Sequence, residues 1–131
     1  RWIDLPRGTA TPEAFARQVE TLSGVIVADL LAANPPDALL AVSDGFVPGL
    51  AAAARRCGRE PGTGLVIAGY DHYWPDIPER SYESTVPAVS VDKQHARIGA
   101  ALAALALDPR PAGPRQQVIQ PILAFPGELS P

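Results

Sequence analysis

The 131-residue sequence predicts an α/β fold, a three-layer sandwich in which helices cover both faces of a mainly parallel sheet. Two short apolar runs, residues 38–42 and 65–68, are bounded by turn residues and lack the alternation of a half-exposed strand. Such runs are typical of parallel strands that are buried on both faces. The alanine-rich stretch between them completes a strand–helix–strand unit of about 30 residues. A chain of this length forms about one domain.

The N-terminal part is predicted to contain a short strand followed by one long amphipathic helix. Residues 2–5 are an extended, apolar stretch that Pro6 would end. Thr11, followed by a proline and an acid, is typical of an N-cap at a helix start. The Ser23-Gly24 pair predicts either a kink or a boundary between two elements. Apolar residues recur at spacings of three and four and predict one buried face: Phe15, Val19, Leu22, Ile26 and Leu30.

The alanine-rich stretch after the first buried strand is predicted to be the crossover helix. Asp44-Gly45 can open it, and Pro48 then lies in the first turn, where a missing N–H group does little harm. Gly58 is placed to end the helix. The Gly-Thr-Gly stretch 62–64 lacks the lysine and the following helix of a phosphate-binding loop, so we interpret it as a turn.

The C-terminal half is less regular. Residues 72–86 carry several prolines and aromatic residues and predict an irregular loop, and residues 88–91 predict a short extended piece. An amphipathic helix is expected over 94–107, and then a Pro/Gly/Arg-rich linker over 108–115. A final strand, interrupted by a proline, is expected over 118–123.

Composition argues against several classes of protein. The net charge of −3 is unlike that of nucleic-acid-binding domains, and the cluster Arg55, Arg56 and Arg59 falls where cations stabilise a helix C-terminus. The single cysteine, Cys57, excludes an internal disulfide framework and is compatible with a reducing compartment. No apolar run reaches the roughly 20 residues that span a bilayer, and the N-terminus does not resemble a signal peptide. The chain has no methionine, so we expect a fragment of a cytoplasmic protein.

Polar residues follow both buried strands. Ser43 and Asp44 come after the first strand, and Asp71 and His72 come after the second. In open α/β sheets, ligands bind just beyond the carboxyl ends of the strands. Trp74 lies close by in the sequence, and an aromatic ring beside carboxylates suits a sugar or a heterocycle. Asp71 could equally well cap the turn after its strand, and Trp74 could pack within the loop.

Signatures of an enzyme or of a metal site are weak. No G-x-S-x-G motif is present, and a serine nucleophile at position 43 would need His72 as its base. Asp44, Asp71 and His72 are of the residue types that bind metals, but no spacing motif supports a metal site. We therefore expect a binding protein with no catalytic residues, no metal and no cofactor.

Three stretches together resemble a known family. The stretches are PPDALLAVSD, VIAGYD and VPAVSVDKQHARIGAALAALAL, and the alanine-rich helix lies between the first two. Together with this helix they resemble the effector-binding core of LacI/GalR-type transcription regulators. That core is similar to the type I periplasmic binding proteins. The resemblance covers about residues 23–123.

The resemblance implies two α/β lobes with a small-molecule effector, sugar or nucleoside-like, bound between them. Residues 1–131 would then be a fragment of the effector-binding domain, its C-terminal lobe, with helix 94–107 packing on the N-terminal lobe. DNA would be bound only through a helix-turn-helix headpiece that this chain does not contain. Asp71 matches a common effector contact and Asp44 matches the family's aspartate. Ser43 stands where the family usually has asparagine. His72 replaces the family's usual aspartate or asparagine, and Lys93 replaces its glutamine.

The resemblance also implies a homodimer. We expect its contacts at Val47, Ala51 and Tyr82, with Leu50 and Ala54 facing the sheet. A solute-binding protein of a sugar transporter is the alternative, because it shares the lobe fold.

Overall fold

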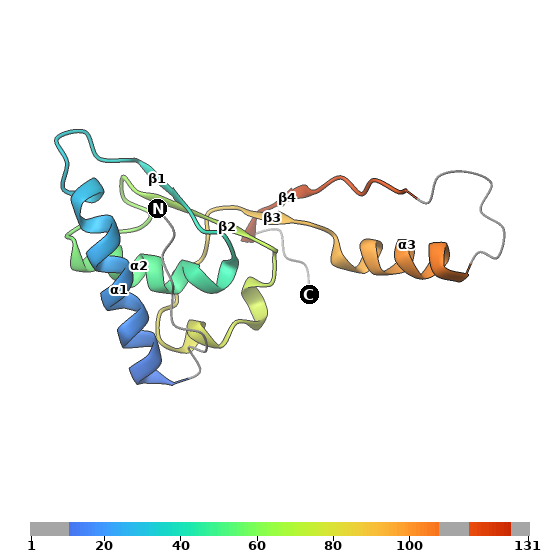
Figure 1. Cartoon of the computed structure of the whole chain (residues 1–131). Helices are drawn as coiled ribbons and strands as arrows, with labels where there is room; N and C mark the ends of the chain where they lie inside the picture. Colours follow the sequence, from blue (N-terminus) through green and yellow to red (C-terminus); the bar gives the residue numbers. More distant parts are fainter. Residues whose placement is uncertain (1–10, 108–115, 127–131) are drawn as a thin grey trace.

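A four-stranded sheet lies at the centre of the computed structural model, which describes residues 11–107 and 116–126 (Figure 1). Across the sheet the order is β1, β2, β3, β4, and the first three strands are parallel while β4 runs antiparallel to β3. The prediction of an α/β fold with a mainly parallel sheet is confirmed. The strands are β1 (Ala38–Leu40), β2 (Val66–Tyr70), β3 (Ser90–Asp92) and β4 (Ile122–Ala124).

Helix α1 (Pro12–Leu30) forms as the sequence pattern predicts. The Thr11 hydroxyl accepts a hydrogen bond from the Ala14 backbone N–H at 3.2 Å and so caps the first turn. All five residues of the predicted apolar face are buried. The helix continues through Ser23 and Gly24, so there is no boundary at that pair, and Gly24 simply lies on the exposed side.

Helix α2 (Val47–Arg56) follows the short helical turn η1 (Asp44–Phe46) and is buried between α1 and the sheet. The two helices pack closely at Gly49, where an added Cβ would lie 2.8 Å from Gln18 Oε1 and 3.0 Å from Leu22 Cδ1. Beyond α2, Gly58 has a φ of +77°, which is typical of a glycine that ends a helix.

The burial of α2 in the core overturns the expected dimer contact. Val47 and Ala51 are 0% exposed because this face of α2 lies inside the core of a single chain. Neither residue offers surface to a second copy, so the prediction is wrong at both positions. Leu50 and Ala54 are also buried. Tyr82 stays partly exposed, but its ring packs on Phe15 of α1 at a centroid distance of 5.2 Å.

Helices cover one face of the sheet among the described residues. Ala41 and Ile67 are buried on the face toward α2, whereas Leu40 is 71% exposed and Val66 45% exposed on the other face. The prediction that both strands are buried on both faces is therefore wrong for this part of the chain. The reason is that α1 stacks on α2, so the two helices form a double layer on one side. A third layer on the other side stays a prediction.

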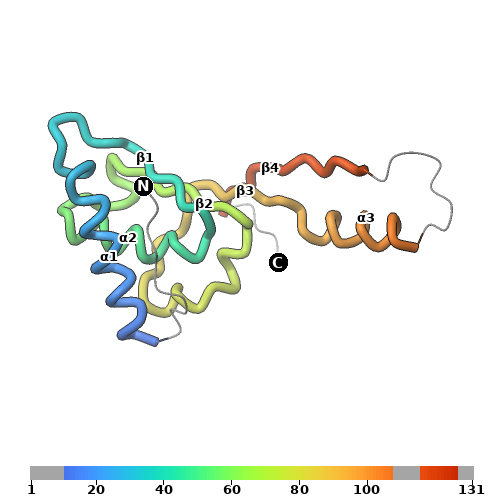
Figure 2. Tube along the Cα trace, in the orientation of Figure 1, coloured from blue at the N-terminus to red at the C-terminus, as the bar shows by residue number. Residues whose placement is uncertain are grey.

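Helix α3 (His95–Leu107) leads away from the rest of the molecule and contains no buried residue (Figures 1 and 2). The loop between β2 and β3 contains two short helical turns, η2 (Trp74–Asp76) and η3 (Pro78–Ser81). The strand expected at residues 2–5 and the linker at 108–115 lie outside the described residues. In the part of the chain that the structure describes, no helix combines the length and the apolar character needed to span a membrane.

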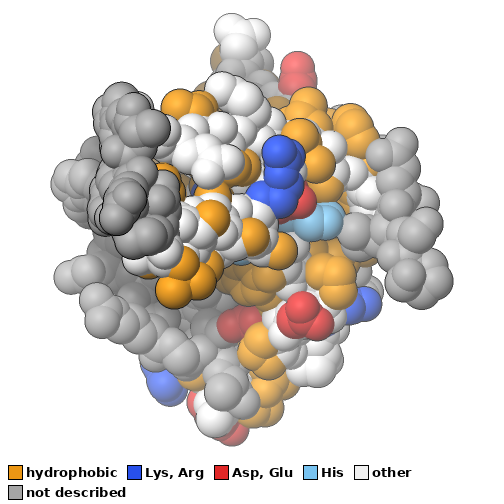
Figure 3. Space-filling model, turned by 90° about the vertical axis from the view of Figure 1, so that its right-hand side faces the viewer, with side chains coloured by type: hydrophobic (Ala, Val, Ile, Leu, Met, Phe, Trp, Pro, Cys, Tyr) orange, Lys and Arg blue, Asp and Glu red, His pale blue; other side chains and the backbone are white. Residues whose placement is uncertain are grey.

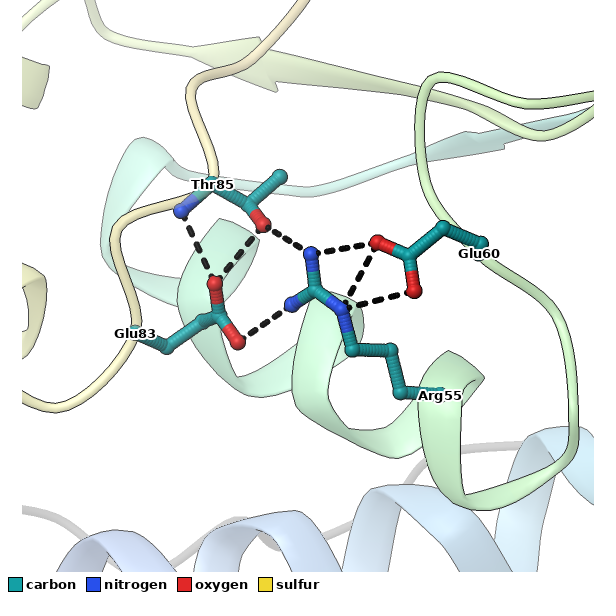
Figure 4. A network of polar contacts seen from close by, with 4 residues as sticks. All are labelled: Arg55, Glu60, Glu83 and Thr85. Atoms are coloured by element: carbon teal, nitrogen blue, oxygen red, sulfur yellow. Dashed lines mark hydrogen bonds and ion pairs between the residues drawn. The ribbon is translucent and has the colours of Figure 1, made fainter.

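Arg55 joins two loops at the amino-terminal edge of the sheet (Figure 4). Its guanidinium donates to both carboxylate oxygens of Glu60, at 2.8 and 3.0 Å, to Glu83, and to the Thr85 hydroxyl at 3.0 Å. Thr85 in turn donates its backbone N–H and its hydroxyl to Glu83. Burial alone would raise the pKa of Glu83, but the hydrogen bonds from Thr85 and Arg55 outweigh it and lower that pKa. Arg55 therefore has a structural role, and so does Arg59, which donates to the Gly64 carbonyl at 2.9 Å.

Candidate ligand site at the carboxyl ends of the strands

The carboxyl ends of β1, β2 and β3 lie side by side because the three strands are adjacent and parallel. Ser43, Asp71 and Lys93 follow these three ends in turn. Figure 3 views the molecule from the side toward which α3 points and shows basic, acidic and histidine side chains close together near its centre, among hydrophobic ones. This edge is the candidate site.

Asp44 lies beneath the edge and is 0% exposed. Its Oδ2 accepts the backbone N–H groups of Tyr73 and Trp74 at 2.9 and 3.0 Å, and its Oδ1 accepts the Ser90 hydroxyl at 2.7 Å. A Cβ on Gly69 would lie 2.0 Å from Oδ1, so only glycine fits at that point of β2. Asp44 therefore positions the loop after β2 and has no surface for a ligand, in contrast to the contact expected from the sequence.

Tyr73 connects the end of β1 to the loop after β2. Its hydroxyl oxygen lies 2.7 Å from Ser43 Oγ and accepts the Gly45 backbone N–H at 3.2 Å. The sequence placed Ser43 close to His72 as a possible base, but the structure places the Tyr73 hydroxyl there instead. Ser43 and Tyr73 both keep exposed surface, so their hydroxyl groups remain available to a ligand.

The backbone at this edge is strained. Among the described residues, those other than glycine with a positive φ are Asp71 at +90°, His72 at +53° and Gln94 at +59°. Residues held in this region cost of order 1–3 kcal/mol each and are concentrated at functional sites. Hydrogen bonds hold the strained pair in place, because Asp71 N–H donates to the Val91 carbonyl at 2.9 Å and His72 N–H to Ser90 Oγ at 3.2 Å.

Asp71 and Lys93 form an ion pair between the ends of β2 and β3. The Lys93 ammonium also lies 5.2 Å from the centroid of the Tyr70 ring, within the range of a cation–π contact. The side chains of Asp71 and Lys93 are 21% and 37% exposed, so a small molecule can reach both. The hydrogen bond with Asp71 raises the pKa of Lys93, which is therefore a cation at neutral pH.

Gln94 cross-links the start of α3 to the segment that precedes β4. Its backbone N–H donates to Asp92 Oδ1 at 2.6 Å, and its side-chain amide donates to the Gln120 carbonyl and accepts from Arg97 at 2.6 Å. These hydrogen bonds link the point at which α3 leaves the sheet, next to Lys93, to the segment before β4.

Trp74 does not take the role expected for it. Its side chain is 4% exposed and belongs to the hydrophobic core, and the Arg80 guanidinium lies 5.1 Å from its ring centroid. No face of the indole is free to stack on a ligand. The alternative, that Trp74 packs within the loop, is the one the structure supports.

Two apolar grooves, each of about 250 Å³, lie away from Asp71 and Lys93. One lies between α3 and residues 117–119, and the other between α1, the start of α2 and the end of β1. Neither combines charged groups of both signs. In the ranges 11–107 and 116–126, no three histidine, cysteine or acidic side chains are grouped so as to hold a metal ion.

The arrangement can bind a small polar molecule. The Asp71 carboxylate accepts hydrogen bonds, the Lys93 ammonium donates them, and the Ser43 and Tyr73 hydroxyl groups can do either. The sequence identified Ser43, Asp71 and His72 correctly as strand-end residues. It gave Tyr73 and Lys93 no role in the site. The rule that singled out the first two strand ends also applies to the third, where it would have found Lys93.

Comparison with models of protein families, with curated proteins and with solved structures finds no match to this chain.

Proposed function

We propose that this chain is the C-terminal lobe of the effector-binding domain of a LacI/GalR-type transcription regulator, and that it senses a sugar or a nucleoside-like molecule. One observation carries the proposal. Partly exposed polar side chains follow three neighbouring parallel strands, and the backbone at two of them, Asp71 and His72, is held in a strained conformation. Such an edge is where α/β sheets bind small molecules.

The packing around Asp44 supports the resemblance. The three sequence stretches that resemble the family meet there: Asp44 comes from the first, Gly69 from the second and Ser90 from the third. The Gly69 position has to be glycine because the Asp44 carboxylate occupies the space of a Cβ. The spacing of the motifs thus has a common physical reason, which is to assemble one buried polar centre below the site.

The exposed surface of α3 supports the proposal that a second lobe exists. Leu102 and Leu107 are 61% and 82% exposed, and no residue of this helix is buried. A second lobe that packs on this helix would cover them and would face the strand-end edge across the ligand. We therefore expect the intact protein to bind its effector far more tightly than this lobe alone.

The remaining features of the proposal follow from the same family. The protein acts in the cytoplasm, is not an enzyme and contacts DNA through a separate headpiece. It forms a homodimer, which would present two headpieces to a palindromic operator. The contacts of that dimer have to lie away from Val47 and Ala51, since both are inside the core.

An NMR titration tests the location of the site. The 131-residue chain, labelled with ¹⁵N, is titrated to millimolar concentrations with glucose, galactose, ribose, adenosine and uridine. We expect at least one compound to shift the backbone amides at residues 43–45, 70–73 and 90–94 selectively. Shifts that are confined to the groove beside α3 or to the groove beside α1 would contradict the proposed site, and so would the absence of shifts with every compound.

A further inference from the structure

The ion pair between Asp71 and Lys93 restricts what the site can bind. The Lys93 ammonium occupies an acceptor position of the Asp71 carboxylate, which is the group best placed to accept hydrogen bonds from ligand hydroxyls. A hydroxyl that binds to the same oxygen, Asp71 Oδ1, therefore has to compete with Lys93 or displace it. The two side chains come from adjacent strands, so each has a fixed base.

A displaced Lys93 needs a new partner. The neighbouring carboxylate of Asp92 already accepts the Gln94 backbone N–H at 2.6 Å. Asp44 is buried below the edge, where it accepts three hydrogen bonds. The Tyr70 ring, 5.2 Å from the ammonium, stabilises a cation but does not neutralise it. A neutral ligand that displaces Lys93 from Asp71 thus leaves the ammonium without a counter-ion. An anionic group on the ligand would supply that counter-ion.

We propose that Lys93 is a specificity-determining residue that selects small polyhydroxylated anions. The hydroxyl groups of such a ligand bind Asp71, and its carboxylate or phosphate group becomes the new partner of Lys93. This inference rests on the proposed function, because it assumes that the strand-end edge is the ligand site. It adds a class of ligand: sugar acids or sugar phosphates in place of neutral sugars.

A purely structural pair would behave differently. Exposed ion pairs contribute little to stability, and a pair that serves only as a surface contact gives no preference between ligands. Replacing Lys93 would then leave the relative affinities for acidic and neutral sugars unchanged. The selectivity, rather than the stability, therefore separates the two interpretations.

The test compares matched acidic and neutral ligands by NMR titration of the 131-residue chain at constant ionic strength. The probes are glucuronate with glucose, galacturonate with galactose, and glucose 6-phosphate. We expect the better acid to bind at least about tenfold more tightly than its neutral counterpart, as a hydrogen bond to a charged group implies. Tighter binding of glucuronate or of glucose 6-phosphate tells whether carboxylate or phosphate is preferred.

Two variants and a control isolate the role of Lys93. Lys93→Gln should remove the preference for the acid, and Lys93→Arg should keep it. Arg56→Gln makes the same change of net charge at an exposed position in the last turn of α2 and should also keep it. A preference that survives Lys93→Gln, or that Arg56→Gln removes equally, overturns the inference.

The outcomes also separate the inference from the proposed function. If neutral sugars shift the strand-end amides as strongly as the acids do, the site stands and the inference fails. If neither acids nor neutral sugars shift these amides, the proposed function and the inference fail together.

Discussion

Replacing Asp44 with alanine is expected to lower the free energy of unfolding by about 3–5 kcal/mol, because three donors lose their acceptor and each unsatisfied donor costs about 1–3 kcal/mol. The structure shows why. The Asp44 carboxylate accepts three hydrogen bonds, at 2.7, 2.9 and 3.0 Å, while fully buried. Each hydrogen bond to a charged group contributes about 1.5–3 kcal/mol. The net loss is smaller than three such bonds because the variant no longer has to bury a charge.

A milder variant keeps the test informative if Asp44→Ala fails to fold. Asp44→Asn retains one oxygen, which can still accept the backbone N–H groups of Tyr73 and Trp74. Its amide NH₂ would face Ser90 Oγ, which already accepts the His72 N–H and would lose its own acceptor. One buried donor is then unsatisfied, so we expect a loss of about 1–3 kcal/mol.

Urea denaturation followed by circular dichroism measures both losses. The double variant Asp44→Ala/Ser90→Ala supplies a second check, because the two residues share a hydrogen bond and their effects should not add. A loss below about 1 kcal/mol for Asp44→Ala would refute the account of the buried polar centre, in which each bond to the carboxylate is worth more than that. Full additivity of the two substitutions would refute it as well.

Three further predictions concern packing and pH. Gly69→Ala should lower the free energy of unfolding by about 1–3 kcal/mol, because the added Cβ would overlap the buried Asp44 carboxylate. Gly24→Ala, at an exposed helix position with nothing within 4 Å, should raise it by about 1 kcal/mol. A loss of stability in both variants would contradict this account of the packing. Ala51→Glu should unfold the chain, because it buries an unpaired charge. Ala16→Glu, on the exposed surface of α1, should leave the chain folded. An Ala51→Glu chain that light scattering finds to be a compact, folded monomer would contradict the burial of Ala51. Glu83 has a pKa below its ordinary value of 4.5, so its stabilisation is present above that pH and is lost as the pH falls through the lowered value. The urea midpoint of the parent chain should therefore exceed that of Glu83→Gln at pH 7, and the gap should narrow as the pH falls below 4.5. A constant gap would contradict the assignment.

Local features of the fold could be predicted because they depend on neighbouring residues. The apolar face of α1 and its Thr11 cap are set by spacing and by one side chain, and both appear as expected. The two parallel strands could be predicted from their apolar runs and flanking turns.

The burial of α2 could not be predicted from its sequence. An alanine-rich helix is apolar on nearly every side, and this composition does not tell whether α1 or a second copy covers the outer face. Val47 and Ala51 were assigned to a dimer for that reason, while in the structure both are fully buried in the core of the single chain.

The candidate site could be predicted only in part. Asp71 could be found because it follows a recognisable strand. Its ion pair with Lys93 could not be predicted, because it depends on β2 and β3 being neighbours, which the sequence alone does not determine. The roles of Trp74 and Tyr73 could not be separated either. Both backbone N–H groups bind Asp44, and this anchoring turns the indole into the core and leaves the phenol at the surface.

The central claim, that Asp71 contacts the effector at the strand-end edge, is tested most directly by calorimetry on Asp71→Gly with the compound that binds best in the titrations. Glycine is preferred to alanine because Asp71 has a φ of +90°, which glycine adopts without strain. We expect affinity to fall about 10- to 150-fold, corresponding to the loss of about 1.5–3 kcal/mol for a hydrogen bond to a charged group. Asp76→Ala, an exposed aspartate in the same loop, should leave affinity unchanged. Unchanged affinity in Asp71→Gly, or an equal loss in both variants, would contradict the claim.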